Sequence, residues 1–361
     1  MERNRLGLAR VMAVFVSLLC AVAGDSIAQG SSTGANRLRI VGGLGSLNQY
    51  TRHEEPFWAK TLAQLSGGKF GAEIVPFDRA GVPGEDMLRL MQLGVVPFGT
   101  AQLSRIATQD PEFSAPDLAG LNPDMITLKR NLAAFRPYLE KTLRERYGIE
   151  LLAVYAYPAQ VIFCKKPLAR LTDLTGRRIR VSGTTAADFI EAFGGVPVVT
   201  SLNDMLPNLA SGNIECAITG TMSGNTIGLH EVTSHIHSMT LTWGLSIFAA
   251  NGSAWEGLPT DLKSLLRKEL PRLESAIWDE SDRETAEGIA CNTGAASCNS
   301  GRKGKMIEVR AAAEDERRRK EVFAAKVLPR WVQRCGASCV PLWNQTLAAS
   351  SGIKASTALT K

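Results

Sequence analysis

Short apolar runs alternate with amphipathic stretches along most of the chain, which predicts an α/β protein. The strand-like runs are short and bounded by turn residues, and they are 38–43, 72–77, 149–157, 177–182, 196–200 and 214–220. The helical stretches repeat apolar residues at helical spacing, and they are 48–68, 84–94, 122–147, 185–195 and 201–212. Alternating strands and helices form parallel sheets covered by helices.

Local signals fix some of the predicted helix ends. Asn122 and Pro123 form a good N-cap and first-turn pair, so a long helix is expected to begin there and to end at Tyr147, before Gly148. Ser201 and Asp204 have the spacing of a capping box. From Pro259 onward the chain becomes helical and charged.

The N-terminal residues have the pattern of a secretory signal peptide. Three arginines lie within the first ten residues, an apolar run follows at 11–24, and 26–28 is a small-x-small cleavage pattern. The apolar run is shorter than the ~20 residues that a membrane-spanning helix needs. We therefore predict export to the periplasm, cleavage near Ala28, and a fold that excludes residues 1–28.

Length and charge narrow the class of protein. Removing 28 of the 361 residues leaves 333, which suits two domains better than one. The net charge of +6 becomes +5, because the signal peptide holds three arginines and two acidic residues. The charges are scattered, so they favour an anionic ligand over nucleic acid. The run 314–320 mixes both signs and is typical of a solvated helix face.

Six cysteines remain after export. Cys291 and Cys298, and likewise Cys335 and Cys339, lie close together in sequence, and an oxidising compartment favours disulfides there. Local pairing is favoured, although crossed pairing stays open. A zinc site is disfavoured because C-x2-C spacing is absent. The other two, Cys164 and Cys216, lie in strand-like runs and are expected to be small buried hydrophobic residues.

The most specific pattern in the sequence lies in 167–220. Its motifs are Pro167, Asp173-Leu174-Thr175-Gly176, Ile179-Arg180-Val181, Gly194, Val196-Pro197, Ser201 with Asp204, and Gly212-Asn213-Ile214-Glu215. In this order they resemble the solute-binding proteins of TRAP transporters, the DctP-type family. The likeness extends to 81–96, 250–259 and 327–331.

This resemblance implies a two-domain periplasmic binding protein that closes on its ligand like a clamp. Crossing strands and a long C-terminal helix are expected to link the domains. We expect the first α/β domain to comprise 29–156 plus 240–300, and the second to comprise 157–239 plus 301–361. The resemblance also implies delivery of an organic acid to a sodium-driven transporter. We further expect a monomer that works with small and large integral-membrane subunits, with no cofactor and no catalysis.

Arg180 is the predicted ligand-binding arginine. Along a strand, Arg178 and Arg180 share one face and Arg177 has the other, and Arg180 is nearest the carboxyl end, where α/β sheets bind ligands. A guanidinium can hold a carboxylate with two parallel hydrogen bonds. The arginine that binds carboxylates in the family falls on the same position. Arg177 and Arg178 are expected to face solvent.

Two departures from the family pattern narrow the predicted ligand. A second arginine that many members carry would fall near Ala159, and an asparagine that relatives carry is replaced by Thr219. Both changes remove a partner for a second acidic group. We therefore expect a monocarboxylate.

Further candidates for ligand contact come from the crossings and the loops. Each has a simple structural alternative: Trp243 could only pack at the second crossing, and Glu85 could only cap a helix. The remaining candidates are Tyr157 and Gln160 at the first crossing, and Thr219, Thr221 and Asn225 in a polar segment after a strand.

One enzyme class with a partial signature is an exported zinc hydrolase. His230, His235 and His237 include a His-x-His pair, and Glu231 could serve as a base. No H-E-x-x-H motif is present, so surface or core histidines are the favoured interpretation.

Two other enzyme motifs are incomplete. The glycines of 39–49 lack the last glycine of a dinucleotide fingerprint, since Asn48 stands there, and the acidic Asp78 comes late. Ser223 is one place late for G-x-S-x-G. The main alternative is therefore another binding protein, one that serves an ATP-driven importer.

Overall fold

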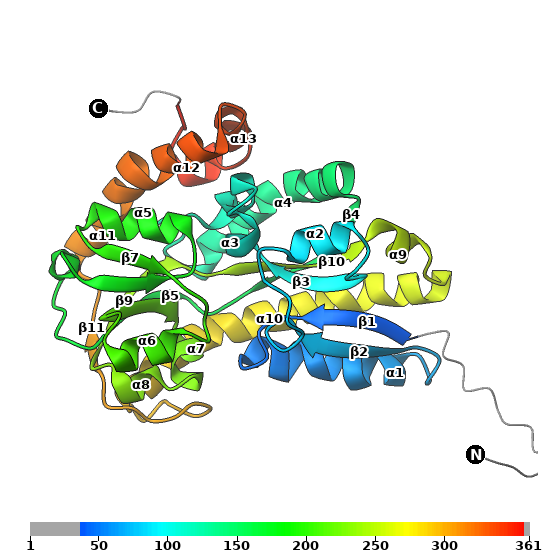
Figure 1. Ribbon diagram of the computed structural model, residues 1–361, viewed down its shortest axis with the longest axis horizontal. Coiled ribbons are helices and arrows are strands. Elements are labelled where there is room, and N and C mark those ends of the chain that lie inside the picture. Colours follow the sequence, from blue (N-terminus) through cyan, green and yellow to red (C-terminus); the bar gives the residue numbers. More distant parts are fainter. Residues whose placement is uncertain (1–36, 357–361) are drawn as a thin grey trace, which may run out of the picture. The chain divides into compact units, whose positions relative to one another are not determined.

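Two β-sheets with helices packed on them make up the computed structural model, which describes residues 37–356 (Figure 1). The predicted signal peptide lies outside the described residues. Everything described belongs to one compact unit, and the α/β class predicted from the alternation is confirmed. Within 37–356, no helix is long and apolar enough to cross a bilayer.

The helices follow the strands as the amphipathic stretches predict. The α-helices are α1 (Leu62–Leu65), α2 (Met87–Gln92), α3 (Leu103–Ile106), α4 (Met125–Tyr147), α5 (Thr184–Ala192), α6 (Met205–Ser211), α7 (Thr221–Thr226), α8 (Leu229–Val232), α9 (Gly252–Glu256), α10 (Thr260–Thr293), α11 (Ala313–Val322), α12 (Leu328–Cys335), α13 (Cys339–Thr346) and α14 (Ala348–Ser351). Tighter or wider helical turns are η2 (Gln49–Glu54), η3 (Phe57–Thr61), η4 (Pro111–Asp117), η5 (Leu171–Leu174) and η6 (Phe323–Val327).

The first sheet has the strand order β2-β1-β3-β10-β4. Its strands are β1 (Arg37–Gly42), β2 (Gly71–Pro76), β3 (Phe98–Gln102), β4 (Ile149–Ala156) and β10 (Leu245–Asn251). β1 pairs in parallel with β2 and β3, whereas β10 runs antiparallel to β3 and β4. Trp58 of η3 and Leu266 of α10 are buried in one apolar cluster, and Met87 of α2 and Phe135 of α4 in another.

The second sheet has the order β11-β9-β5-β8-β6-β7. Its strands are β5 (Gln160–Cys164), β6 (Arg178–Val181), β7 (Val196–Val199), β8 (Cys216–Gly220), β9 (His235–Thr242) and β11 (Ile307–Val309). β6 is parallel to its neighbours β7 and β8, so their carboxyl ends meet at one edge. That edge is where the predicted arginine would meet a ligand.

The chain passes between the two sheets at 157–159 and again at 243–244. The Tyr157 N–H donates to Gly244 O at 3.0 Å, which ties the two crossings together. The Asp117 carboxylate accepts hydrogen bonds from the backbone N–H groups of Trp243 and Gly244, at 3.0 and 2.8 Å. Gly244 has φ +78°, a left-handed conformation that favours glycine. The expected division into domains at these crossings stays a prediction.

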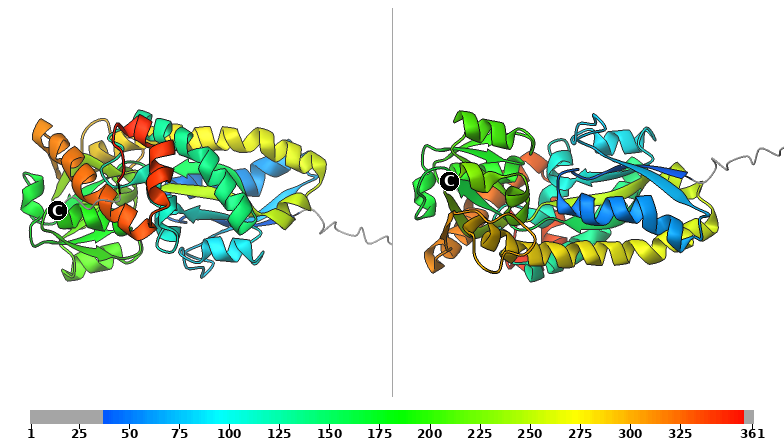
Figure 2. Two further views of the ribbon diagram at one scale, coloured as in Figure 1. Left: turned by 90° about the horizontal axis from the view of Figure 1, so that it is seen from above. Right: turned by 90° about the horizontal axis from the view of Figure 1, so that it is seen from below.

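The long helix α10 contacts elements of both sheets (Figures 1 and 2). Its Trp278 indole donates to Val154 O of β4 at 2.7 Å, and the Thr221 hydroxyl of α7 donates to its Glu284 O at 3.0 Å. At Gly288 a Cβ would lie 2.3 Å from Met222 N, so this close approach to α7 requires glycine.

The start of α4 differs from the prediction. Asp124, not Asn122, caps the helix, because its carboxylate accepts from the Thr127 N–H at 2.7 Å. Asn122 is fully buried, where its side chain donates to Pro116 O at 2.9 Å and accepts from Asn131 at 2.6 Å. The predicted end at Tyr147, followed by left-handed Gly148, is correct. Ser201 and Asp204 contact each other, with the Asp204 N–H donating to Ser201 Oγ at 3.2 Å. The expected capping box was wrong, however, because α6 begins at Met205 and Asp204 is its N-cap, without a side-chain hydrogen bond.

The cysteines form three disulfides. Cys291 pairs with Cys298 and Cys335 with Cys339, which are the local pairings that the spacing favours. The prediction for Cys164 and Cys216 was wrong in part: both are buried, but they are bonded to each other. They lie directly opposite on the antiparallel strands β5 and β8, a neighbour relation that the order of elements along the chain does not give.

Candidate ligand-binding site

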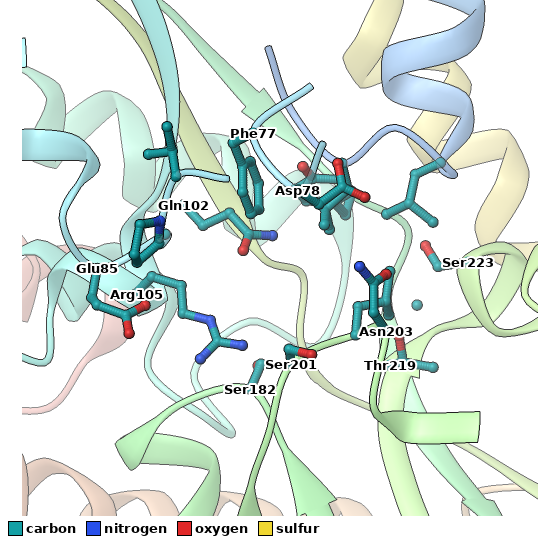
Figure 3. A pocket seen from close by; sticks show the side chains of 18 of the residues that line it. Phe77, Asp78, Glu85, Gln102, Arg105, Ser182, Ser201, Asn203, Thr219 and Ser223 are labelled. Carbon is teal, nitrogen blue, oxygen red and sulfur yellow. The ribbon is translucent and has the colours of Figure 1, made fainter. Parts of the chain in front are cut away.

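A cavity of about 360 Å³ lies where residues of both sheets approach each other (Figure 3). Segments that follow β2 and β3 line it from the first sheet, and β6, β8 and the segment after β7 line it from the second. Its walls combine apolar side chains such as Leu44 and Phe77 with charged and hydrogen-bonding groups. This is the composition of a small-molecule site.

Arg180 lines this cavity from β6. It is only 3 % exposed, its Nε donates to Thr200 O at 3.1 Å, and its Nη1 donates to Ile218 O at 2.9 Å. Thr200 follows β7, and Ile218 belongs to β8. The guanidinium of Arg180, itself on β6, is therefore fixed at the carboxyl ends of three strands. Burial, with the positive charge of Arg105 added, lowers the pKa of Arg180 to about 9, and it therefore stays protonated at neutral pH. Within residues 37–356 it forms no ion pair.

Arg105 is a second cation in the same cavity, and the sequence analysis did not identify it. It belongs to the short helix α3, directly after β3 of the first sheet, and its Nη2 donates to Thr200 O at 3.4 Å. Figure 3 shows its guanidinium extending into the cavity toward Ser182. The strand-end rule that selected Arg180 would also have selected Arg105, had the run 98–102 been recognised as a strand.

Two carboxylates also line the cavity. Asp78 follows β2 and accepts a hydrogen bond from the Gly45 N–H at 3.0 Å, and Glu85 is exposed at the rim. Figure 3 places Glu85 beside Arg105, whereas Asp78 lies on the other side of the cavity. Neither forms an ion pair with an arginine of the described chain, so the cavity presents both signs of charge to a ligand.

The predicted contacts Tyr157, Gln160, Thr219 and Glu85 all line the cavity with Arg180. Gln160 Oε1 is buried and has no hydrogen-bond partner in the described part of the chain, which leaves this oxygen free to accept a hydrogen bond from a ligand. The Tyr157 hydroxyl is deeply buried, and this burial, together with the charge of Glu54, raises its pKa well above the usual range. Both residues therefore act as neutral hydrogen-bonding groups.

Three other predicted contacts lie away from the cavity lining. Thr221 of α7 is fully buried and donates its hydroxyl to Glu284 O of α10 at 3.0 Å, and Asn225 binds the backbone N–H and C=O of Arg302, both at 2.8 Å. Trp243 is 2 % exposed and donates its indole N–H to Asn122 O at 3.1 Å. Their positions support packing roles.

A buried carboxyl group outside the cavity lining acts electrostatically on Tyr157, which is part of that lining. Glu54 of η2 is fully buried and accepts hydrogen bonds from Gly43 N at 3.1 Å, Thr100 Oγ1 at 2.7 Å and Gln49 Nε2 at 3.0 Å. Burial raises its pKa to about 7 despite these bonds. Burial likewise raises the pKa of Asp117 at the second crossing to about 6.

The histidines of 230–237 do not converge on one point. His237 is fully buried, with Nε2 3.6 Å from Asp315 and Nδ1 accepting from Met239 N, and His235 contacts Ser234. Residues 37–356 contain no group of three His, Cys, Asp or Glu side chains placed to hold a metal ion.

Comparison with known families decides the classification. Residues 47–291 match the model of the bacterial extracellular solute-binding proteins, family 7, the DctP family. The chain belongs to this family. The resemblance seen in 167–220 is thereby confirmed, and the protein is a solute-binding protein of the TRAP type. Members of the family are extracytoplasmic receptors rather than enzymes, and they work with TRAP membrane components.

Solved structures show the same fold. The solute receptor DctP7 of Bordetella pertussis, which binds pyroglutamic acid, is 20 % identical and covers 86 % of this chain and 99 % of its own, with a TM-score of 0.75. A TRAP solute-binding protein of Desulfovibrio salexigens with bound orotic acid is 16 % identical, and one of Shewanella oneidensis with bound succinate is 17 % identical. Both cover 87 % of this chain and 99 % of their own, with TM-scores of 0.72. No curated protein matches this sequence.

Proposed function

We propose that this solute-binding protein captures a small organic acid in the periplasm through Arg180 and delivers it to a sodium-coupled TRAP transporter. One observation carries the proposal: a buried, protonated arginine faces a cavity between the two sheets and has no acidic partner among the described residues. A buried charge without a counter-ion is costly. A ligand carboxylate would supply the missing partner.

A small acid with one carboxylate is the proposed ligand. The cavity of about 360 Å³ is at the lower end of the range for small-molecule sites. Gln160 Oε1, Asp78 and Glu85 can accept hydrogen bonds from hydroxyl or N–H groups of the ligand. Pyroglutamate and orotate, which similar proteins bind, combine one carboxylate with such groups.

The binding cycle follows from where the contacts lie. In an open form, Arg180 attracts an anion to the cavity. The carboxylate pairs with Arg180, while groups after β2 and β3 contact the rest of the ligand from the first sheet. Because these contacts come from both sheets, the ligand binds the closed form more tightly and shifts the population toward it. The closed form is then the state that docks on the small and large membrane subunits.

A thermal-shift screen of the exported protein tests the proposed ligand class. The panel contains pyroglutamate, orotate, L-gulonate and succinate, with glucose, glutamine and zinc as controls. An acid at 100 times its Kd adds ~2.7 kcal/mol to the free energy of unfolding, which raises the Tm by several degrees. Stabilisation by pyroglutamate, orotate or L-gulonate supports the proposal, and stabilisation by succinate alone would refute the assignment of a single carboxylate. Stabilisation only by a sugar, an amino acid or zinc would refute the proposal.

Delivery to the transporter needs its own measurement. Proteoliposomes that contain the two membrane subunits should take up the radiolabelled acid only when both this protein and an inward sodium gradient are present. Uptake driven by ATP without sodium would instead identify an ATP-driven importer as the partner.

A further inference from the structure

We propose that Arg105 is the second arm of the carboxylate clamp and binds the same ligand carboxylate as Arg180. This inference rests on the proposed function and extends it, because it assigns a specificity-determining residue. The position near Ala159, where many relatives carry a second arginine, holds none here. Arg105 brings a second guanidinium to the same cavity from a different element, α3.

The two guanidiniums converge on one oxygen atom. Arg105 Nη2 and Arg180 Nε both donate to Thr200 O, over 3.4 and 3.1 Å, so these nitrogens are at most 6.5 Å apart. Each carboxylate oxygen accepts hydrogen bonds of ~2.8 Å from guanidinium nitrogens. One carboxylate beside the Thr200 carbonyl can therefore reach both arginines.

The hydrogen bonds already present leave the right donors free. Arg180 uses Nε and Nη1 on backbone carbonyls, which leaves Nη2 without a bond to another described residue. Arg105 makes only the long bond from Nη2, so Nε and Nη1 are uncommitted within 37–356. Arg105 Cγ lies 3.4 Å from where a Cβ on residue 84 would be, so glycine at this position leaves room for the arginine stem. Figure 3 shows the guanidinium extending into the cavity. Arg105 thus has more free donors than Arg180.

The charges explain why an anion is required. Two guanidiniums this close repel each other. The lining carboxylates Glu85 and Asp78, and Asp204, whose charge acts on Arg180, form no ion pair with either arginine in the described chain. A carboxylate between the arginines removes the repulsion, whereas a neutral amide of the same shape does not. Because Arg105 follows a strand of the first sheet and Arg180 lies in the second, the shared carboxylate also joins the two sheets. The charge of the ligand therefore favours closure.

Calorimetry on four proteins tests the clamp: wild type, Arg105→Gln, Arg105→Lys and the control Arg89→Gln. Arg89 is exposed on α2 and is not part of the cavity lining, so its substitution removes the same charge from the first-sheet side without touching the site. The probes are pyroglutamate, orotate, L-gulonate and succinate, each with its amide counterpart.

The expected result is a loss specific to the carboxylate. Arg105→Gln should weaken the carboxylates that bind by about 10- to 100-fold, the usual contribution of a charged hydrogen bond. The affinity for these acids should fall less in Arg105→Lys than in Arg105→Gln, and it should fall less than twofold in Arg89→Gln. On Arg105→Gln, the affinity for the amide counterparts should fall much less than the affinity for the acids. The Tm of unliganded Arg105→Gln should equal or exceed that of wild type, because the side chain makes one long bond and its removal relieves the repulsion with Arg180.

Two results would overturn the inference and leave the proposed function standing. Equal affinity of wild type and Arg105→Gln for an acid would show that Arg105 does not touch the ligand. Equal losses for an acid and its amide would show that Arg105 contacts another part of the ligand. If none of the acids binds wild type, the proposed function fails and the clamp fails with it.

Discussion

The buried carboxyl of Glu54 should make stability depend on pH in a way that one substitution removes. Its pKa rises from 4.5 to about 7 on folding because burial disfavours the charged form. The folded protein therefore binds this proton more tightly than the unfolded chain does. The stabilising effect is complete below pH 4.5 and is lost as the pH rises through 7, and a shift of this size corresponds to ~3 kcal/mol.

Glu54→Gln should therefore raise the free energy of unfolding at pH 8 by up to ~3 kcal/mol and leave it nearly unchanged at pH 5. The amide oxygen can keep the bonds from Gly43 N and Thr100 Oγ1. The new amide nitrogen takes the position that now accepts from Gln49 Nε2 at 3.0 Å, so the Gln49 amide must turn over. Its Oε1, which has no partner among the described residues, then accepts from the new nitrogen in place of the present bond. Removing the charge thus costs no hydrogen bond.

Urea unfolding followed by tryptophan fluorescence at both pH values measures this difference. Glu55→Gln is the matched control, because Glu55 is the exposed neighbour on the same turn. It should change the stability little at either pH. A Glu54→Gln protein that is less stable than wild type at pH 8 would refute the reasoning. It would mean that the three hydrogen bonds hold the carboxylate more strongly than burial disfavours it.

Three further changes test the site and the fold. Arg180→Gln should weaken acid binding by ~2–5 kcal/mol, because it removes one partner of a buried charge pair; unchanged affinity by calorimetry would exclude Arg180 from the site. Replacing Cys164 and Cys216 by alanine should lower the free energy of unfolding by ~4 kcal/mol, and replacing Cys291 and Cys298 by alanine should lower it by ~2 kcal/mol, since the disulfides span 52 and 7 residues. Equal losses in urea unfolding would contradict this entropic account. Trp243→Phe should lower the free energy of unfolding by about 1 kcal/mol through the lost bond to Asn122 O and should leave affinity unchanged; a weaker calorimetric affinity would show that Trp243 contacts the ligand.

Local patterns predicted the fold and part of the site. Strand and helix alternation depends on the periodicity of apolar residues, which is visible in the sequence. Arg180 could be selected because it lies near the end of a strand in a motif shared with a known family. The start of α4 was misplaced by two residues, since Asp124 and Asn122 are both good N-caps and the buried contact with Asn131 decides between them.

The contacts that the sequence did not predict join residues distant along the chain. Arg105 belongs to a helix of four residues, too short to show a periodic pattern, and it meets the carbonyl of Thr200 through tertiary structure alone. Cys164 and Cys216 become neighbours only once β5 and β8 are known to be adjacent. Strand order in a sheet depends on packing between whole elements, and neither cysteine carries a local signal of it.

The disulfide between β5 and β8 has a consequence for producing the protein. The bond fixes the pairing of Cys164 with Cys216, and along the same two strands this pairing places Gln160 opposite Gly220 and Val161 opposite Thr219. A slip of one residue would turn Thr219 away from the cavity, because side chains alternate between the faces of a strand. A chain made in a reducing cytosol would lack this disulfide. Preparations for binding studies should therefore come from secretion or oxidative refolding, and the thiol content of each batch should be counted before its affinity is measured.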